Sequence, residues 1–443
     1  MRPVEALWRT VAALSLAITA VAVPASLAGA EPLSAPAPAE AAATRPFVYG
    51  VTIADTSPAA GHAFDLARRA GFTHAYVVLD WGNVQPERGR FAWDLGRAND
   101  LDNFLTAARA HGMRLIVRLG RPPAWVGAPA TMAPADLEAF SAGVAARACG
   151  IATAYEVFNE PNLAYEWGGT PDPARYAHLL AAARRGVKRG DPEALVVAAG
   201  LAPHTGNAQG TIEDVDFLRA MYAAGARGHF DVLGIHPYGG NVSPDADPAG
   251  CGICFRRAEL YRQVMVESGD AGTQAWVTEF GYLHTTGLDL GQYNWLKLGP
   301  EQQGAYLASA FRYGYEQWSW LGGMVAFNLD FDTVPWNSPQ LGAYWFAMLN
   351  PDRSPRPAYL AMRDLAKPGA AALLPVTTAA PQTAPTPAVA PSTATLQAPR
   401  SPAPATAPTT APAVAPSAGD VICRTTAGRA VCGLAVSLAG SRR

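Results

Sequence analysis

Eight short apolar runs alternate with polar loops and amphipathic stretches between residues 47 and 367. Most of these runs are rich in β-branched or aromatic residues and almost continuously apolar, which is typical of parallel strands covered on both faces. The predicted strands are Phe47–Thr52, His74–Asp80, Arg114–Leu119, Ala154–Asn159, Leu195–Gly200, Phe230–His236, Gln274–Glu279 and Gly323–Asn328. The predicted helices are Ala60–Ala70, Leu101–His111, Ala133–Ala148, Pro173–Arg189, Val215–Ala224, Arg256–Glu267, Glu301–Tyr315 and Pro357–Leu365.

Eight strand-then-helix units in roughly 320 residues predict an α/β fold, a (β/α)8 TIM barrel. The alternative is a doubly wound open sheet, which usually carries a Gly-rich phosphate-binding turn after its first strand. Residues Ile53–Pro58 contain no such turn, so the closed barrel is favoured. We expect a single catalytic domain over residues 47–368.

The N-terminal residues have the pattern of a targeting segment. Two arginines come before an apolar run from Val11 to Val23, and an Ala-Gly-Ala sequence ends at Ala30. This is typical of a cleavable secretory signal. The apolar run is also shorter than the ~20 residues that span a membrane. We expect residues 1–30 to be a signal peptide, the protein to be secreted without a membrane span, and residues 31–46 to form a disordered linker.

The C-terminal residues have a different composition from the barrel. Residues 369–419 are almost wholly Ala, Pro and Thr, which predicts a disordered linker because proline opposes helices and sheets and little apolar surface is available for burial. The short segment 420–443 contains Cys423 and Cys432, which in an exported protein are expected to close a small disulfide loop. Whether this tail associates with a cell surface is left open.

Composition narrows the function classes. The chain has 443 residues, of which 49% are hydrophobic, and this excludes a wholly disordered protein. A net charge of −2 provides no basic field for nucleic acid. The eight histidines are scattered without an H-x-H pair, so no metal and no other cofactor is predicted. Cys251 and Cys254 are expected to form a local disulfide, and Cys149 to be a buried free thiol.

Two glutamates lie where a barrel carries its chemistry, at the carboxyl ends of strands. Glu160 follows the fourth predicted strand and Glu279 ends the seventh. Two carboxyl groups about 5 Å apart can cleave a glycosidic bond with retention: one attacks the anomeric carbon, and the other protonates the departing oxygen and later deprotonates water. Either glutamate alone is better explained as an exposed loop residue, but two at matching strand ends favour a catalytic pair. Glu156, within the fourth strand, is expected to be a buried structural carboxylate.

Several motifs resemble those of a known group of enzymes. Residues Tyr155–Asn162, His236–Tyr238 and Trp276–Gly281 resemble the strand-four, strand-six and strand-seven signatures of glycoside hydrolase clan A, the (β/α)8 retaining glycosidases. Residues Trp81–Gly89 and Pro355–Tyr359 resemble further parts of these enzymes. The chain is most similar in this respect to family 39 and to the family 5 cellulase-like members.

The resemblance implies roles for individual residues. Glu160 corresponds to the acid/base and Glu279 to the nucleophile. Asn159 is expected to contact the hydroxyl beside the anomeric carbon. Tyr238 is expected to hydrogen-bond the nucleophile. His236, from the same motif, is expected to contact the substrate.

Two positions depart from the clan pattern. Tyr76 lies near a place where the clan often has arginine, and Arg118 on the third strand is expected to substitute for it. Phe327 stands where a tryptophan commonly forms the platform under the reacting sugar, with Trp336 nearby in the following loop. Because the apolar faces of aromatic rings match those of sugars, Trp81 and Trp336 complete the predicted substrate contacts.

The leading hypothesis is a secreted retaining β-glycosidase that hydrolyses a polysaccharide or oligosaccharide without a cofactor. A carbohydrate-binding barrel without catalytic activity is one alternative, and a transglycosylase that uses the same two glutamates is another. The sequence leaves the sugar, the linkage and endo or exo action open.

Overall fold

The computed structural model describes residues 45–207, 210–285, 287, 289, 291–335, 337–375, 421–426 and 429–434. For residues 291–293, 421–426 and 429–434 it describes the backbone alone. The predicted signal peptide, most of both predicted linkers and Trp336 lie outside the described residues.

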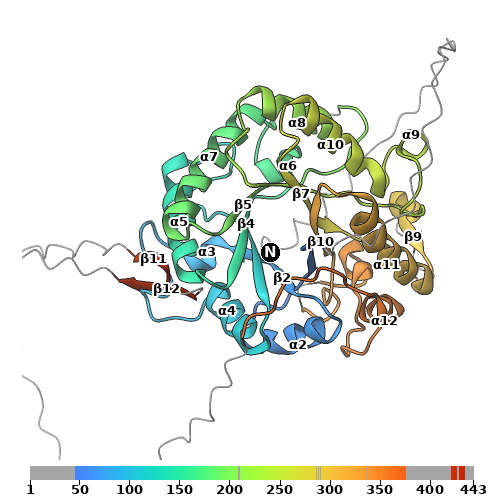
Figure 1. Cartoon of the computed structure of the whole chain (residues 1–443), viewed down its shortest axis with the longest axis horizontal. Coiled ribbons are helices and arrows are strands. Elements are labelled where there is room, and N and C mark those ends of the chain that lie inside the picture. The colour runs from blue at the N-terminus through green and yellow to red at the C-terminus, as the bar shows by residue number, and fades with distance from the viewer. Residues whose placement is uncertain are drawn as a thin grey trace, which may run out of the picture.

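Eight parallel strands close into a barrel in the order β1-β10-β7-β6-β5-β4-β3-β2 (Figure 1). This confirms the predicted TIM barrel. The barrel strands are β1 (Val48–Thr52), β2 (His74–Asp80), β3 (Arg114–Gly120), β4 (Ala152–Val157), β5 (Leu195–Ala198), β6 (Val232–Ile235), β7 (Gln274–Phe280) and β10 (Leu321–Ala326). Two short pairs lie apart from the barrel sheet: β8 (Leu283–His284) with β9 (Lys297–Leu298), and β11 (Val421–Thr426) with β12 (Arg429–Leu434).

Helices surround the barrel (Figure 1). The eight that the sequence predicts are α2 (Gly61–Arg69), α4 (Asp100–His111), α5 (Pro134–Ala148), α7 (Pro173–Gly190), α8 (Asp214–Ala223), α10 (Ala258–Glu267), α11 (Pro300–Gln317) and α12 (Pro357–Asp364). Short helices in the loops are η2 (Pro58–Ala60), α3 (Trp81–Val84), α6 (Ala164–Trp167), α9 (Pro248–Cys251), η3 (Phe255–Arg257), η4 (Gly291–Leu296) and η5 (Gly342–Phe346). Every predicted strand and helix begins and ends within two residues of the observed element.

Local sequence explains where these helices begin and end. Proline is the first residue of α5, α7, α11 and α12, where its fixed φ suits a helix and its missing N–H leaves no unmade hydrogen bond. Asn99 caps α4 by accepting from the backbone N–H of Asp102. The same helix ends at Gly112, whose φ of 67° lies in the left-handed region that glycine adopts without strain.

The barrel interior is filled by one apolar layer to which each strand contributes a residue. Its buried members are Val48, Tyr76, Ile116, Ala154, Val197, Val232, Trp276 and Val325. Because side chains alternate between the two faces of a strand, the residue two positions further along points to the same side. Arg118, Glu156 and Thr278 hold these next positions. The packed apolar layer therefore closes the barrel, and β3, β4 and β7 place polar side chains directly above it.

The structure confirms the cysteine predictions in part. Cys251 and Cys254 form a disulfide, as expected. Cys149 is free, as expected, but it is partly exposed, which corrects its prediction as buried: it comes directly after the last residue of α5. The β11–β12 register places Cys423 opposite Cys432.

Among the described helices, none is both long enough and apolar enough to span a bilayer.

Trp81 belongs to the core, which corrects its prediction as a sugar contact. Its side chain is fully buried and stacks on Phe140 of α5, with ring centroids 4.1 Å apart. Its indole N–H donates to Gln85 at 2.9 Å. Both faces of the ring and its polar atom are already occupied by protein, so no surface remains for a sugar.

Replacing Trp81 by alanine is expected to lower the free energy of unfolding by about 3–5 kcal/mol, because the substitution leaves a cavity in a packed core. Trp295, which is 47% exposed, is the matched control, and Trp295→Ala should cost less than about 1 kcal/mol. Urea unfolding followed by circular dichroism measures both values. Equal costs for the two variants would contradict the core assignment of Trp81.

Candidate active site

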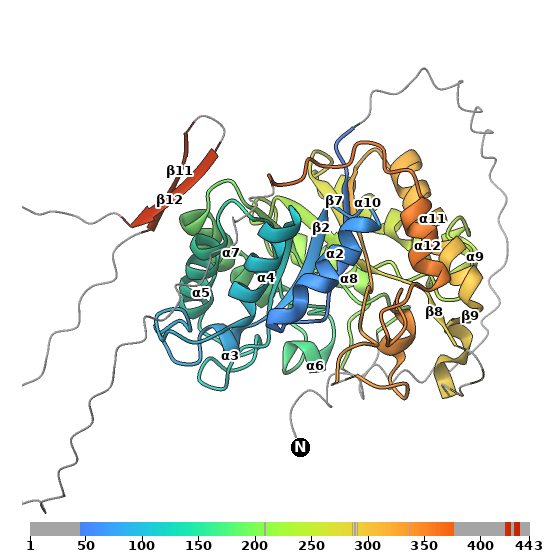
Figure 2. The same cartoon turned by 90° about the horizontal axis from the view of Figure 1, so that it is seen from below.

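The loops that follow the strands gather at one end of the barrel. Figure 2 shows α3 and α6, which follow β2 and β4, at the lower end of the view. Glu160 lies in the loop between β4 and α6, and Glu279 is the penultimate residue of β7. Strand topology therefore brings two residues far apart in the sequence to the same mouth.

A left-handed turn positions Glu160. β4 ends at Val157, two residues before the predicted end, because the backbone leaves the extended conformation at Phe158, whose φ is 71°. Glu160 itself has a φ of 39°. Non-glycine residues adopt such values at a cost and are held in them by their surroundings. Here the Glu160 backbone N–H donates to the carbonyl of Gly200 at 3.1 Å, which ties the turn to the end of β5.

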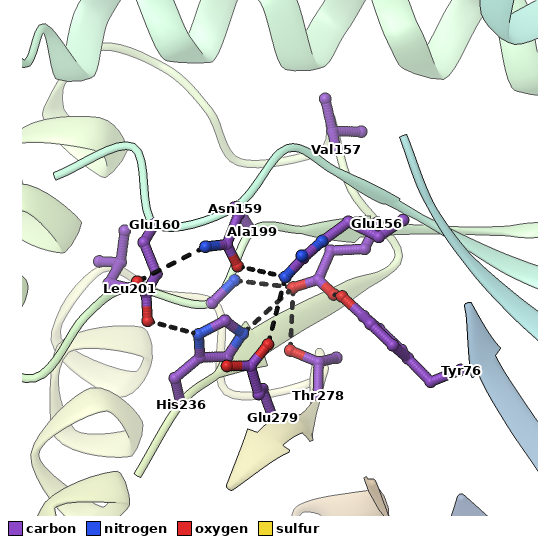
Figure 3. A network of polar contacts seen from close by, with 12 residues as sticks. Tyr76, Glu156, Val157, Asn159, Glu160, Ala199, Leu201, His236, Thr278 and Glu279 are labelled. Atoms are coloured by element: carbon purple, nitrogen blue, oxygen red, sulfur yellow. Dashed lines mark hydrogen bonds and ion pairs between the residues drawn. The ribbon is translucent and has the colours of Figure 1, made fainter. Parts of the chain in front are cut away.

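His236 holds the carboxyl group of Glu160. The distance from His236 Nδ1 to Glu160 Oε1 is 3.0 Å, and Figure 3 shows the two side chains directed at each other. The imidazole is fully buried and lies against Gly200, where a Cβ atom would come within 2.1 Å of the ring. Burial alone would lower the pKa of His236. The hydrogen bond to Glu160 and the charge of Glu279 outweigh this effect and raise the pKa above its usual value.

Two donors hold the carboxylate of Glu279. The hydroxyl of Tyr238 donates to Oε1 at 2.5 Å, and Arg118 Nη1 donates to Oε2 at 3.2 Å. Burial acts to lower the pKa of Arg118, but Tyr76 and Glu279 raise it above its usual range, so the guanidinium stays charged. Both contacts stabilise a negative charge on Glu279. Burial and the neighbouring Glu279 also raise the pKa of Tyr238, which keeps its phenol protonated as a donor.

The two glutamates meet across the mouth. One carboxylate oxygen of Glu160, one of Glu279 and a ring nitrogen of His236 all lie within 4.8 Å of one another. This matches the carboxyl separation of about 5 Å that allows one group to attack and the other to transfer a proton at the same bond. The three side chains also have donor types that metal ions accept. Arg118 opposes a cation at this place, so the arrangement favours proton transfer.

Glu156 lies beneath this pair and is the buried structural carboxylate that the sequence predicts. It is fully buried and accepts three hydrogen bonds: from the Tyr76 hydroxyl at 2.5 Å, the Gly200 backbone N–H at 2.8 Å and the Thr278 hydroxyl at 2.9 Å (Figure 3). Burial, and then the charge of Glu156, raise the pKa of Tyr76. Tyr76 thus holds Glu156 beneath the site. Arg118 supplies the positive charge beside Glu279.

Asn159 connects the two halves of the site. Its side-chain oxygen accepts from Arg118, and its Nδ2 lies 3.5 Å from Glu160 Oε2. The same Nδ2 donates at 2.9 Å to Oε1 of Glu166 on α6. The predicted residues Arg118, Asn159, His236 and Tyr238 are therefore all in contact with one of the two glutamates.

Sequence reasoning missed Glu166. Burial, and then the charge of Glu160, raise its pKa to about 7. The signal available in the sequence was a second acidic residue in the loop that carries Glu160, directly after β4. Aromatic residues also occur at this mouth: Phe327 packs edge-to-face on Tyr238, and Tyr165 of α6 is 36% exposed.

The chain was compared with known proteins. No protein-family model and no curated protein matches it. Among solved structures, a family 39 glycoside hydrolase from the gut symbiont Bacteroides cellulosilyticus WH2 is 24% identical with a TM-score of 0.54, and the match covers 72% of this chain and 63% of that one. The chain thus spans less than two thirds of the length of that enzyme.

Two further solved structures are similar. GH5_18 from Streptomyces cattleya, solved in complex with GlcNAc, is 16% identical with a TM-score of 0.56, over 73% of this chain and 80% of that one. A glucosidase from Croceicoccus marinus is 19% identical with a TM-score of 0.55, over 73% and 68% of the two chains. The likenesses show a shared fold. Family 39 and family 5 glycoside hydrolases are among the proteins that have this fold.

Proposed function

We propose that the protein is a retaining β-glycosidase that hydrolyses glycosidic bonds of a polysaccharide or oligosaccharide. The observation that carries this proposal is the approach of the Glu160 and Glu279 carboxylates to within 4.8 Å at the mouth of the barrel. The shared fold with glycoside hydrolases supports it. The N-terminal signal pattern supports export to the medium where such polymers occur.

In the first step, an oxygen of Glu279 attacks the anomeric carbon from one face of the sugar. The bond to the departing oxygen breaks, and the proton of the Glu160 carboxyl moves to that oxygen, so an alcohol leaves. The product is a glycosyl ester on Glu279. The donors Tyr238 and Arg118 fix this carboxylate before the attack, which lowers the entropy cost of reaching the reactive geometry.

In the second step, the Glu160 carboxylate takes a proton from water, and the water oxygen attacks the anomeric carbon. The ester bond to Glu279 breaks, and the sugar leaves with its original anomeric configuration. His236 hydrogen-bonds Glu160 and so maintains the position of this carboxyl while it changes protonation state. Asn159 lies between the two glutamates, where its amide can reach the hydroxyl beside the anomeric carbon.

Replacing Glu279 by glutamine should reduce kcat by at least about 10⁴-fold, because an amide is a poor nucleophile and no glycosyl ester forms. The measurement is hydrolysis of a glycan panel, with product anomers followed by NMR. Glu316→Gln, which alters an exposed residue of α11, is the control and should retain wild-type rates. A Glu279→Gln variant with near-normal turnover would contradict the nucleophile assignment. A folded wild-type protein that binds glycans without cleaving any would favour the binding-barrel alternative.

Replacing Glu160 by glutamine should slow the cleavage of a substrate by an amount that depends on its leaving group. Glycosides with alcohol leaving groups need proton donation, so the rate constant of their first step is expected to fall by about 10²–10⁴-fold. Dinitrophenolate is a leaving group that departs without a proton. With dinitrophenyl glycosides, the glycosyl ester should therefore form at close to the wild-type rate. Rapid-quench kinetics measure the first step for both classes. An equal loss for both would count against Glu160 as the proton donor.

A further inference from the structure

The side-chain amide of Asn159 is held from both ends. On its oxygen side Arg118 donates a hydrogen bond, and on its nitrogen side Glu166 accepts one at 2.9 Å. A flipped amide would direct N–H groups at the guanidinium and the oxygen at the carboxyl group. Both contacts would then be lost, so Arg118 and Glu166 specify the same orientation.

Glu166 occupies its place at an energetic cost. Its side chain is partly buried and faces Glu160 from the β4–α6 loop and Glu279 from β7, both of which oppose a further negative charge. Arg118 on β3 and Arg121 directly after it are the cations that face it. An apolar or amide side chain would occupy this position without placing a third carboxyl group beside Glu160 and Glu279, so packing alone does not account for Glu166.

We propose that Glu166 is a positioning residue of the glycosidase, which accepts a hydrogen bond from Asn159 and thereby fixes its amide beside the Glu160 carboxyl group. The inference rests on the proposed function. One Nδ2 hydrogen is donated to Glu166 at 2.9 Å and the other to Glu160 Oε2 at 3.5 Å. Because the second contact is at the long limit of a hydrogen bond, a hydroxyl of the substrate can replace Glu160 as its acceptor. A hydrogen bond to the hydroxyl beside the anomeric carbon strengthens in the transition state, so its orientation affects kcat more than KM.

The first test compares Glu166→Ala with Glu166→Gln on an aryl β-glycoside that the enzyme cleaves and on its 2-deoxy analogue. Alanine removes the acceptor, and kcat on the hydroxylated substrate should fall about tenfold, the equivalent of one lost hydrogen bond. On the 2-deoxy analogue the loss should be less than about twofold. Glutamine keeps a carbonyl acceptor and should restore kcat to within about threefold of wild type. Equal losses on both substrates, or no loss with alanine, would overturn the proposal.

The second test is independent of activity. The folded-state pKa of Glu166 is about 7, above its ordinary value of 4.5, so the folded protein binds more protons than the unfolded chain in this interval. The contribution of Glu166 to stability therefore falls as pH rises from about 4.5 to about 7. Glu166→Gln does not titrate, and its melting temperature should exceed that of wild type by an amount that grows over this range. A difference that does not change with pH would place the carboxyl group in solvent and overturn the proposal.

The outcomes separate this inference from the proposed function. If Glu279→Gln is inactive and Glu166→Ala behaves as wild type, the inference on Glu166 is wrong while the glycosidase proposal stands. If Glu279→Gln remains active, the proposed function is wrong whatever the Glu166 variants do.

Discussion

Two carboxylates that approach within 4.8 Å constrain everything around them. At an effective dielectric constant of about 20, two full negative charges at that separation repel by about 3 kcal/mol, so the site is stable only if the two groups have different partners. The structure supplies these partners. Glu279 receives a cation and a phenol, which favour its anion, whereas Glu160 is hydrogen-bonded to an imidazole that can exchange a proton with it. The same asymmetry is what a double displacement needs.

The backbone at Gly200 helps to give Glu160 and Glu279 their different partners. Its N–H donates to the buried Glu156, its carbonyl accepts from the backbone of Glu160, and its missing Cβ leaves room for the ring of His236. One residue thus contacts the buried Glu156, the turn that carries Glu160, and His236, which hydrogen-bonds Glu160. A side chain at this position would displace the imidazole and change the partner of Glu160, even though Gly200 itself carries no chemistry.

The parts of this structure that the sequence predicts are those set by local patterns. Apolar runs and helix-start prolines mark the barrel strands and helices, and a strand end is enough to place Glu160 and Glu279 at one mouth because all barrel strands run parallel. Trp81 could not be placed in this way, since the direction of its ring depends on Phe140 from a helix much later in the chain. The left-handed turn at Phe158 has no glycine to mark it. Glu166 lies in a four-residue helix that is too short to give a periodic signal.

Four glutamates meet at this mouth, and their neighbours give each a different character. Glu156 has three donors and no exposure, so its carboxyl group is held in one position beneath the site. Glu279 has a permanent cation, Glu160 a titratable partner, and Glu166 an amide that offers a hydrogen bond without a charge. The order of these partners, from guanidinium to imidazole to amide, is an order of decreasing support for a negative charge. The barrel therefore distinguishes four chemically identical side chains by the residue that faces each one.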